Sequence, residues 1–297
     1  MGAEVLDRVA GGLLGVAAGD ALGATVEFCS PQRIAAEFGV HREIVGGGAF
    51  GWRPGQGTDD TDLTACVARA YASGYELGGV VERFLEWYGR GPRDVGGLTA
   101  RALDHLAEHG DPRRSGAAAN RGQDAGNGSL MRALPTALAR ADRATRLREA
   151  AEISAVTHDD PRCVQACQVY VGIAAGLLDG LRVDEALQHA GAEELHPEVA
   201  AALATDPTQE VGDLPTTGYV IHSLAAAVWA VQQPAALEEV LVALVNRGDD
   251  ADTTGAIAGG LLGVRYGVGA IPRRWLERLE YAGELTWLAA VLADQRR

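Results

Sequence analysis

Two short acidic runs, far apart in the chain, contain the residue types best suited to chemistry. They read GTDDTD at residues 57–62 and DDADTT at residues 249–254. Each concentrates carboxylate and hydroxyl oxygens without a neighbouring His or Cys, and such oxygen donors suit Mg²⁺, Mn²⁺ or Ca²⁺ better than zinc or copper. Because carboxylates this close repel one another unless a cation lies between them, the two runs predict one shared divalent-metal centre.

The number of donors favours two ions over one. A single Mg²⁺ usually keeps several waters and needs few carboxylates, whereas two ions about 3.5–4 Å apart, bridged by an aspartate, use the donors better. The same pattern also fits two independent helix caps, because each run lies where a loop turns into a helix. The expected metal ligands are Thr58, Asp59, Asp60, Asp250, Asp252 and Thr253.

Three further polar residues lie in loops beside expected helices. Glu27 follows the first helix, and His158 precedes a later one. Asn127 lies in the glycine-flanked loop GNG at 126–128, and such loops expose backbone N–H groups to anions. Taken singly, a residue such as Glu27 is more often a solvated loop acid, one such as His158 a helix cap or surface residue, and a GNG sequence merely a turn.

The elements that must position these residues are helices. Apolar residues recur with the helical period over most of the chain, Val and Ile do not alternate, and no NG or DG hairpin joins strand-like runs. We therefore expect an all-α, compact orthogonal multi-helix bundle with a central binuclear metal site, forming one domain over residues 1–297. The expected helices are 5–22, 62–73, 78–88, 98–109, 130–141, 145–156, 161–179, 183–191, 218–231, 236–246, 254–266, 272–283 and 285–297.

One heptapeptide, AGGLLGV, occurs twice, at residues 10–16 and 258–264. Each glycine weakens a helix by up to about 1 kcal/mol relative to alanine, and close approach of two backbones is the usual compensation. We expect these two helices to lie at the centre of the bundle and to pack closely near the acidic site.

Composition excludes several classes of protein. The chain has 297 residues, of which 47% are hydrophobic, and a net charge of −14, so sequence-independent binding to nucleic acid is not expected. The apolar run at 9–18 is too short to cross a bilayer and has no basic leader, which predicts a cytoplasmic protein without membrane association. The four cysteines have no CxxC spacing and are expected to be reduced structural thiols.

Read in order, the motifs resemble those of one enzyme family. GDALG with the following Glu27, then GTDDT, GNGSLMR, THxxP and GDDADTTGAIAGGLLG are similar to motifs of the ADP-ribosylglycohydrolases. This family includes the dinitrogenase-reductase-activating glycohydrolase and the ADP-ribosylarginine and ADP-ribosylserine hydrolases. The resemblance implies a compact all-α protein with two Mg²⁺ or Mn²⁺ ions, held by the six ligands named above.

The resemblance also implies roles for individual residues. Glu27 matches a mobile acid of the first loop, and Asp94 matches an acid that reaches the distal ribose. Asp59, Asp60 and Asp252 would act in catalysis as well as in metal binding. The residues implied to contact substrate are Gly89 and Gly91 near the diphosphate, and Asn127, Gly128 and His158 in the ADP-ribose cleft.

Two positions depart from the family pattern. Some relatives have an aromatic residue before GNG that stacks on adenine, and this chain has Ala125, so Tyr219 is the substitute we expect. The family often reads GGDADT, whereas Asp249 here adds a negative charge beside the ligands, where it would tighten metal binding or face solvent.

The implied activity is hydrolysis of the bond at C1 of the distal ribose, which releases ADP-ribose from a modified target. The ions would bind the ribose hydroxyls and activate a water, Glu27 or Asp94 would move a proton, and the transition state would resemble an oxocarbenium ion. The expected acceptor is an N-linked, arginine-type group on a protein or another molecule. The alternatives are an O-linked serine or nucleobase acceptor, another nucleotide or phosphate substrate, and a non-catalytic ADP-ribose-binding homologue.

Overall fold

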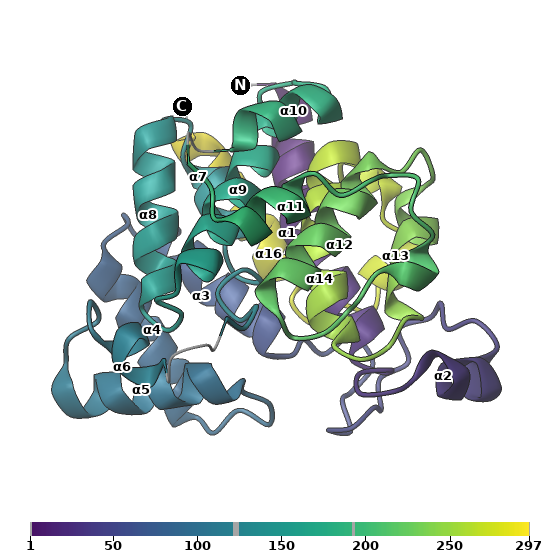
Figure 1. The fold of residues 1–297 in the computed structure, drawn as a ribbon, viewed down its shortest axis with the longest axis horizontal. Helices are drawn as coiled ribbons and strands as arrows, with labels where there is room; N and C mark the ends of the chain where they lie inside the picture. Colours follow the sequence, from purple (N-terminus) through teal and green to yellow (C-terminus); the bar gives the residue numbers. More distant parts are fainter. Residues whose placement is uncertain (1, 121–124, 192–193, 297) are drawn as a thin grey trace.

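The computed structural model, described for residues 2–120, 125–191 and 194–296, is built from helices (Figure 1). Within those ranges no strand forms, and extended pairing is limited to two isolated bridges, Gly47–Trp52 and Gly126–Tyr219. The expected all-α fold is confirmed. The α-helices are α1 (Ala3–Gly23), α2 (Pro31–Phe38), α3 (Asp59–Ala72), α4 (Leu77–Gly89), α5 (Gly97–His109), α6 (Ser115–Ala119), α7 (Leu134–Ala139), α8 (Arg143–Ala155), α9 (Pro161–Leu178), α10 (Val183–Ala190), α11 (Pro197–Leu203), α12 (Val220–Gln232), α13 (Leu237–Val245), α14 (Ala251–Tyr266), α15 (Arg273–Leu276) and α16 (Ala282–Gln295), with 3₁₀ turns at Val211–Asp213 and Val268–Ala270.

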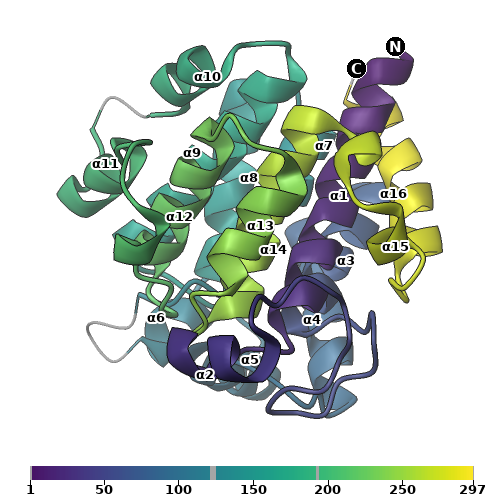
Figure 2. The same cartoon turned by 90° about the vertical axis from the view of Figure 1, so that its right-hand side faces the viewer.

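Helices α1 and α14 lie side by side through the centre of the molecule (Figures 1 and 2). Residues 9–23 of α1 and 251–264 of α14 are all buried. Helices α3, α7, α9, α12, α13 and α16 pack around this pair. In the described part of the chain, no helix is both long and apolar enough to span a membrane.

The repeated heptapeptide forms the contact between α1 and α14. The two helices run antiparallel, and glycines at every fourth position face one another across the interface. A Cβ atom added to any of these glycines would overlap the carbonyl oxygen of its partner, so only glycine permits the approach. The close central packing expected from the repeat is confirmed. The facing pairs are Gly11–Gly263 and Gly15–Gly259 within the repeat, and Gly19–Gly255 one turn beyond it.

Several helix limits differ from the expected ones, for local reasons. Helix α3 begins at Asp59 instead of residue 62, because the Thr58 hydroxyl accepts a hydrogen bond from the Asp60 N–H (3.2 Å). Helix α7 begins only at Leu134, since residues 128–132 form turns. The segment expected as one helix at 272–283 contains the four residues of α15 and the first two of α16. Between them, the Glu280 N–H bonds to the Gly55 carbonyl (3.0 Å).

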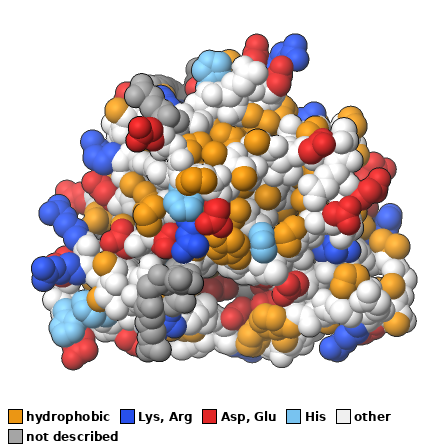
Figure 3. Space-filling model, in the orientation of Figure 1, with side chains coloured by type: hydrophobic (Ala, Val, Ile, Leu, Met, Phe, Trp, Pro, Cys, Tyr) orange, Lys and Arg blue, Asp and Glu red, His pale blue; other side chains and the backbone are white. Residues whose placement is uncertain are grey.

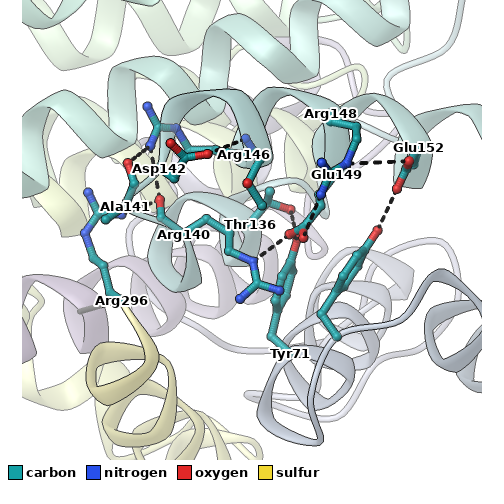
Figure 4. Close-up of polar contacts among 12 residues, drawn as sticks. Tyr71, Thr136, Arg140, Ala141, Asp142, Arg146, Arg148, Glu149, Glu152 and Arg296 are labelled. Atoms are coloured by element: carbon teal, nitrogen blue, oxygen red, sulfur yellow. Dashed lines mark hydrogen bonds and ion pairs between the residues drawn. The ribbon is translucent and has the colours of Figure 1, made fainter.

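A buried polar network joins α3, α7 and α8 away from the acidic runs (Figure 4). The Glu149 carboxylate accepts hydrogen bonds from the Tyr71 hydroxyl (2.9 Å) and the Arg140 guanidinium (2.8 Å). Arg140 also lies over the Tyr71 ring, 5.1 Å from its centroid. Arg146 and Arg296 donate to the carbonyl oxygen of Arg140, just past the end of α7. These arginines satisfy carbonyls that a helix leaves without partners.

Candidate metal centre and active site

The two acidic runs meet at the first turns of α3 and α14. The Thr253 hydroxyl donates to the Asp60 carboxylate over 3.2 Å, although the residues are 193 positions apart. The Thr58 hydroxyl donates to the same oxygen over 3.3 Å. The positive ends of both helix dipoles therefore face one cluster of carboxylates, which favours their charged forms.

The cluster is buried and lacks partners for several of its oxygens. Ligand atoms of Glu27, Asp250 and Asp252 lie within 4.8 Å of one another. Glu27, Asp60 and Asp252 are 6%, 1% and 1% exposed, and one carboxylate oxygen of each has no hydrogen-bond partner in the described residues. Because an unpaired buried carboxylate is costly, the donor set and its unpaired oxygens fit divalent cations.

Burial raises the pKa of every acid in the cluster. It raises the pKa of Glu27 to about 8, with the charges of Asp94 and Asp250 adding to the effect. The pKa values of Asp60 and Asp252 lie well above the ordinary range, first because of burial and then because of neighbouring carboxylates. Such a cluster binds either protons or cations, and a metal that binds there displaces protons.

Asp20 supports the first acidic run at the start of α3, a role the sequence analysis did not assign. This fully buried residue of α1 accepts hydrogen bonds from the backbone N–H groups of Thr58 (3.0 Å) and Thr61 (3.1 Å) and from the Thr61 hydroxyl. It thereby satisfies N–H groups that begin α3 and fixes the first acidic run. Burial raises the pKa of Asp20 to about 7. The available signal was an aspartate inside an otherwise apolar helix.

A cavity of about 330 Å³ opens beside the carboxylates and contains several of the expected substrate residues. Asn127, Gly128 and His158 line it, together with Glu27 and Asp94. The Asn127 side-chain amide donates to Asp250 (2.6 Å), which fixes the orientation of that carboxylate. Burial lowers the pKa of His158 to about 3, so the imidazole is neutral.

Arg132 fixes residues that line this cavity, and the sequence analysis assigned it no role. Its buried guanidinium donates to the Gly128 carbonyl and to the Thr157 hydroxyl, each over 2.6 Å. Thr157 in turn bonds to Nδ1 of His158 (2.7 Å). Arg132 therefore positions both the glycine loop and the imidazole, and its signal was the final residue of GNGSLMR.

Three expected substrate residues lie outside the lining of this cavity. Gly91 lines an adjoining cavity of about 280 Å³, and Gly89 is an exposed residue at the end of α4. The Tyr219 hydroxyl accepts from Arg162 (3.2 Å) and donates to Glu198. Residues 121–124, which precede Ala125 in the sequence, lie outside the described residues.

Comparison with known proteins identifies the class of molecule to which this fold and site correspond. Residues 1–297 match the family model described as ADP-ribosylglycohydrolase. The chain belongs to this family, whose named members are hydrolases acting on glycosidic bonds, and the expected kinship is confirmed.

Individual relatives cover nearly the whole chain. It is 34% identical over 285 residues to the ADP-ribosyl-[dinitrogen reductase] glycohydrolase of Rhodospirillum rubrum, covering 94% of this chain and 92% of that protein. It is 32% identical over 310 residues to the ADP-ribosylarginine hydrolase Tri1 of Pseudomonas putida (strain GB-1), covering 98% and 79%. A solved structure described as an ADP-ribosylglycohydrolase-related protein complex matches with a TM-score of 0.87 at 35% identity, covering 99% of both chains.

Proposed function

We propose that this chain is a divalent-metal-dependent hydrolase that releases ADP-ribose from an N-linked, arginine-type acceptor. The observation that carries the proposal is the buried carboxylate cluster, whose unpaired oxygens lie beside a cavity lined by the glycine loop and a neutral imidazole. A relative named for ADP-ribosylarginine supports an N-linked acceptor, and one named for dinitrogen reductase supports a protein as the acceptor.

Oxygen donors from both acidic runs would hold two Mg²⁺ or Mn²⁺ ions. Thr58, Asp59 and Asp60 come from the start of α3, and Asp250, Asp252 and Thr253 from the start of α14. Divalent ions held there would supply positive charge and Lewis acidity at the reacting end of the cavity. Asp20 and Asn127 would keep the two sets of ligands in register.

Another part of the cavity lining suits the anionic part of ADP-ribose. Gly96 and Gly97, at the beginning of α5, line the cavity. A glycine offers no side chain to cap the helix, so the first N–H groups of α5 are available to a diphosphate, with the helix dipole favouring its charge. His158, held neutral, adds a polar ring without a competing positive charge.

The acids around C1 would perform the proton transfers. Glu27, whose carboxylate lies within the cluster, would orient and deprotonate the attacking water. Asp94, which lines both the main and the adjoining cavity, would protonate the departing nitrogen. The remaining carboxylates stabilise positive charge that develops on the ribose as the glycosidic bond breaks.

Measurement of ADP-ribose release tests this function. The protein is incubated with Mg²⁺ or Mn²⁺ and with ADP-ribosylated arginine, serine, thymidine or guanine acceptors. We expect release from arginine, loss of activity in excess EDTA and recovery when metal is restored. Asp252→Asn should abolish turnover while its helical circular dichroism spectrum stays unchanged. The control Asp184→Asn, at an exposed position, should keep both the turnover and the spectrum of the parent protein. Full activity in EDTA or in Asp252→Asn would overturn the proposal, and release from another acceptor alone would reassign the linkage.

A further inference from the structure

The adjoining cavity of about 280 Å³ shares part of its lining with the main cavity. Asp59 and Asp94 line both cavities, whereas Asp62 and Glu280 line the adjoining one and not the main one. The adjoining cavity is thus formed where the first turn of α3 meets the residues just before α16. The two cavities share acids that the proposed function places around C1 of the ribose.

The bond to be cleaved decides which part of the substrate each cavity receives. In the proposed function the main cavity holds ADP-ribose, and Asp94 protonates the nitrogen that leaves C1. This nitrogen belongs to the acceptor, so the acceptor continues from Asp94 in a direction that ADP-ribose does not occupy. Because Asp94 lines both cavities, the adjoining cavity provides that space.

The charge of Asp62 has no counterion in the described chain. One carboxylate oxygen accepts from the Tyr281 hydroxyl (2.5 Å) and the other from the Trp87 indole N–H (2.9 Å), and both donors are neutral. Arg69, one of the arginines nearest in sequence, forms its ion pair with Glu284 instead (2.6 Å). Because a carboxylate oxygen can accept two hydrogen bonds, each oxygen of Asp62 keeps capacity for a further donor.

The arginines that line the adjoining cavity leave it acidic. Four acids and two arginines line it. Arg53 is neutralised by two hydrogen bonds to Glu280, each of 2.8 Å, and the exposed Arg93 donates to the Gly51 carbonyl (3.2 Å). The chain as a whole carries a net charge of −14, and Figure 3 shows acidic side chains within a hollow on one face. A cationic ligand is therefore favoured.

Aromatic residues complete the lining in a way that suits a guanidinium. Trp52 and Tyr281 both line the adjoining cavity, and aromatic rings are common partners of this planar cation. Trp52 is 6% exposed, and its Nε1 has no hydrogen-bond partner in the described residues. A buried N–H without a partner is costly, and an oxygen of a bound acceptor, such as its backbone carbonyl, would satisfy it.

We propose that the adjoining cavity binds the guanidinium of the acceptor arginine, and that Asp62 recognises its charge. This rests on the proposed function and adds to it the place of the acceptor and a residue that determines specificity. The two oxygens of Asp62 match the paired N–H groups of a guanidinium. Tyr281 and Trp87 hold the carboxylate in position for this contact.

The kinetics of free ADP-ribosylarginine hydrolysis test this inference. We expect Asp62→Asn to raise KM about tenfold, because charge-assisted hydrogen bonds are replaced by weaker neutral ones, and to leave kcat within about threefold of the parent protein. The Kd of ADP-ribose, measured by calorimetry in Mg²⁺, should stay unchanged, since Asp62 does not line the main cavity. The control Glu86→Gln removes an exposed acid that lines a neighbouring cavity with Asp62 but not this one, and it should change none of these values.

Two inhibitors give a readout that does not depend on a variant. Arginine carries the guanidinium, and citrulline has a neutral ureido group of nearly the same shape. In the parent protein, arginine should inhibit hydrolysis at about tenfold lower concentration than citrulline, and Asp62→Asn should remove this difference. Equal inhibition by the two in the parent protein would overturn the inference, as would an unchanged KM in Asp62→Asn. If ADP-ribosylarginine is not hydrolysed in Mg²⁺ or Mn²⁺, the proposed function fails instead, so the two failures are distinguishable.

Discussion

Replacing Gly23 with alanine should disturb the site through the contact between α1 and α14. Gly23 is the last residue of α1, and an added Cβ atom would lie 2.5 Å from Cα of Asp252 and overlap the Ala251 carbonyl. Ordinary van der Waals contact begins at 3.4 Å. The first turn of α14 must therefore move by the difference, about 0.9 Å, and Asp252 and Thr253 move with it.

The expected loss of function exceeds the expected loss of stability. A displacement of about 1 Å at reacting groups lowers rates about 100-fold, so kcat should fall by about that factor. Overpacking costs about 1–3 kcal/mol, while alanine recovers about 1 kcal/mol of helix propensity. The net loss in the free energy of unfolding is therefore about 0–2 kcal/mol, and the variant stays folded.

Two matched glycine variants show whether position along the contact decides the outcome. Gly11→Ala introduces the same kind of clash, against the backbone of Gly263 and Gly267, but about 18 Å further along α1. It should lose stability in urea unfolding and keep its kcat. Gly283→Ala on α16 meets no atom within 4 Å and should change neither. Wild-type kcat in Gly23→Ala, or an equal loss of kcat in Gly11→Ala, would refute this reasoning.

Three further outcomes follow from single residues. Asp249 has a φ of 55°, so Asp249→Gly should remove about 1–2 kcal/mol of strain, partly offset by backbone entropy, and raise the Tm; a lower Tm would contradict this. The pKa of His158 is about 3 in the folded protein against 6.5 in the unfolded chain, so the free energy of unfolding should fall as pH drops from about 6.5 towards 3. His158→Gln should flatten this pH dependence in urea titrations. An identical pH dependence in the variant would exclude the buried neutral imidazole as the cause of the loss. Glu149→Ala leaves Arg140 and Tyr71 without their carboxylate partner and should lower the free energy of unfolding by about 3 kcal/mol. Glu152 is partly exposed, so Glu152→Ala should lower it by less than about 0.5 kcal/mol. Equal losses in the two variants would contradict the burial argument.

The convergence of the two acidic runs could be predicted because the signal is local and chemical. Carboxylates and hydroxyls crowd each helix start, and a shared cation accounts for so many like charges; the alternative of two independent helix caps was made less favourable by the order of the family motifs. The repeated AGGLLGV was informative for the same reason, since several glycines in a helix imply a close neighbour. Asp20 and Arg132 gave weaker signals, because their partners become visible only when α3 and the glycine loop are placed against them.

The errors in helix limits also have physical causes. The hydrophobic period at 130–141 is genuine, but residues 128–132 form turns, where the Arg132 side chain bonds to the Gly128 carbonyl (2.6 Å). The short helices α2 and α11 were not expected, since eight and seven residues provide too little periodicity. Their start signals were nonetheless present as Pro31 and Pro197, each at the first helical position.

The antiparallel pair α1 and α14 has a consequence for how the protein is made. Helix α1 ends at residue 23, and its partner begins at residue 251, so the interface closes a very long loop of chain. At a synthesis rate of roughly 5–20 residues per second, the interval before residue 251 emerges is about 10–50 seconds. Throughout that time the glycine-lined face of α1 has no α14 to pack against. Half of the acidic donors do not yet exist during that interval, so the proposed metal ions could bind only after the second acidic run is made and could not guide the early stages of folding.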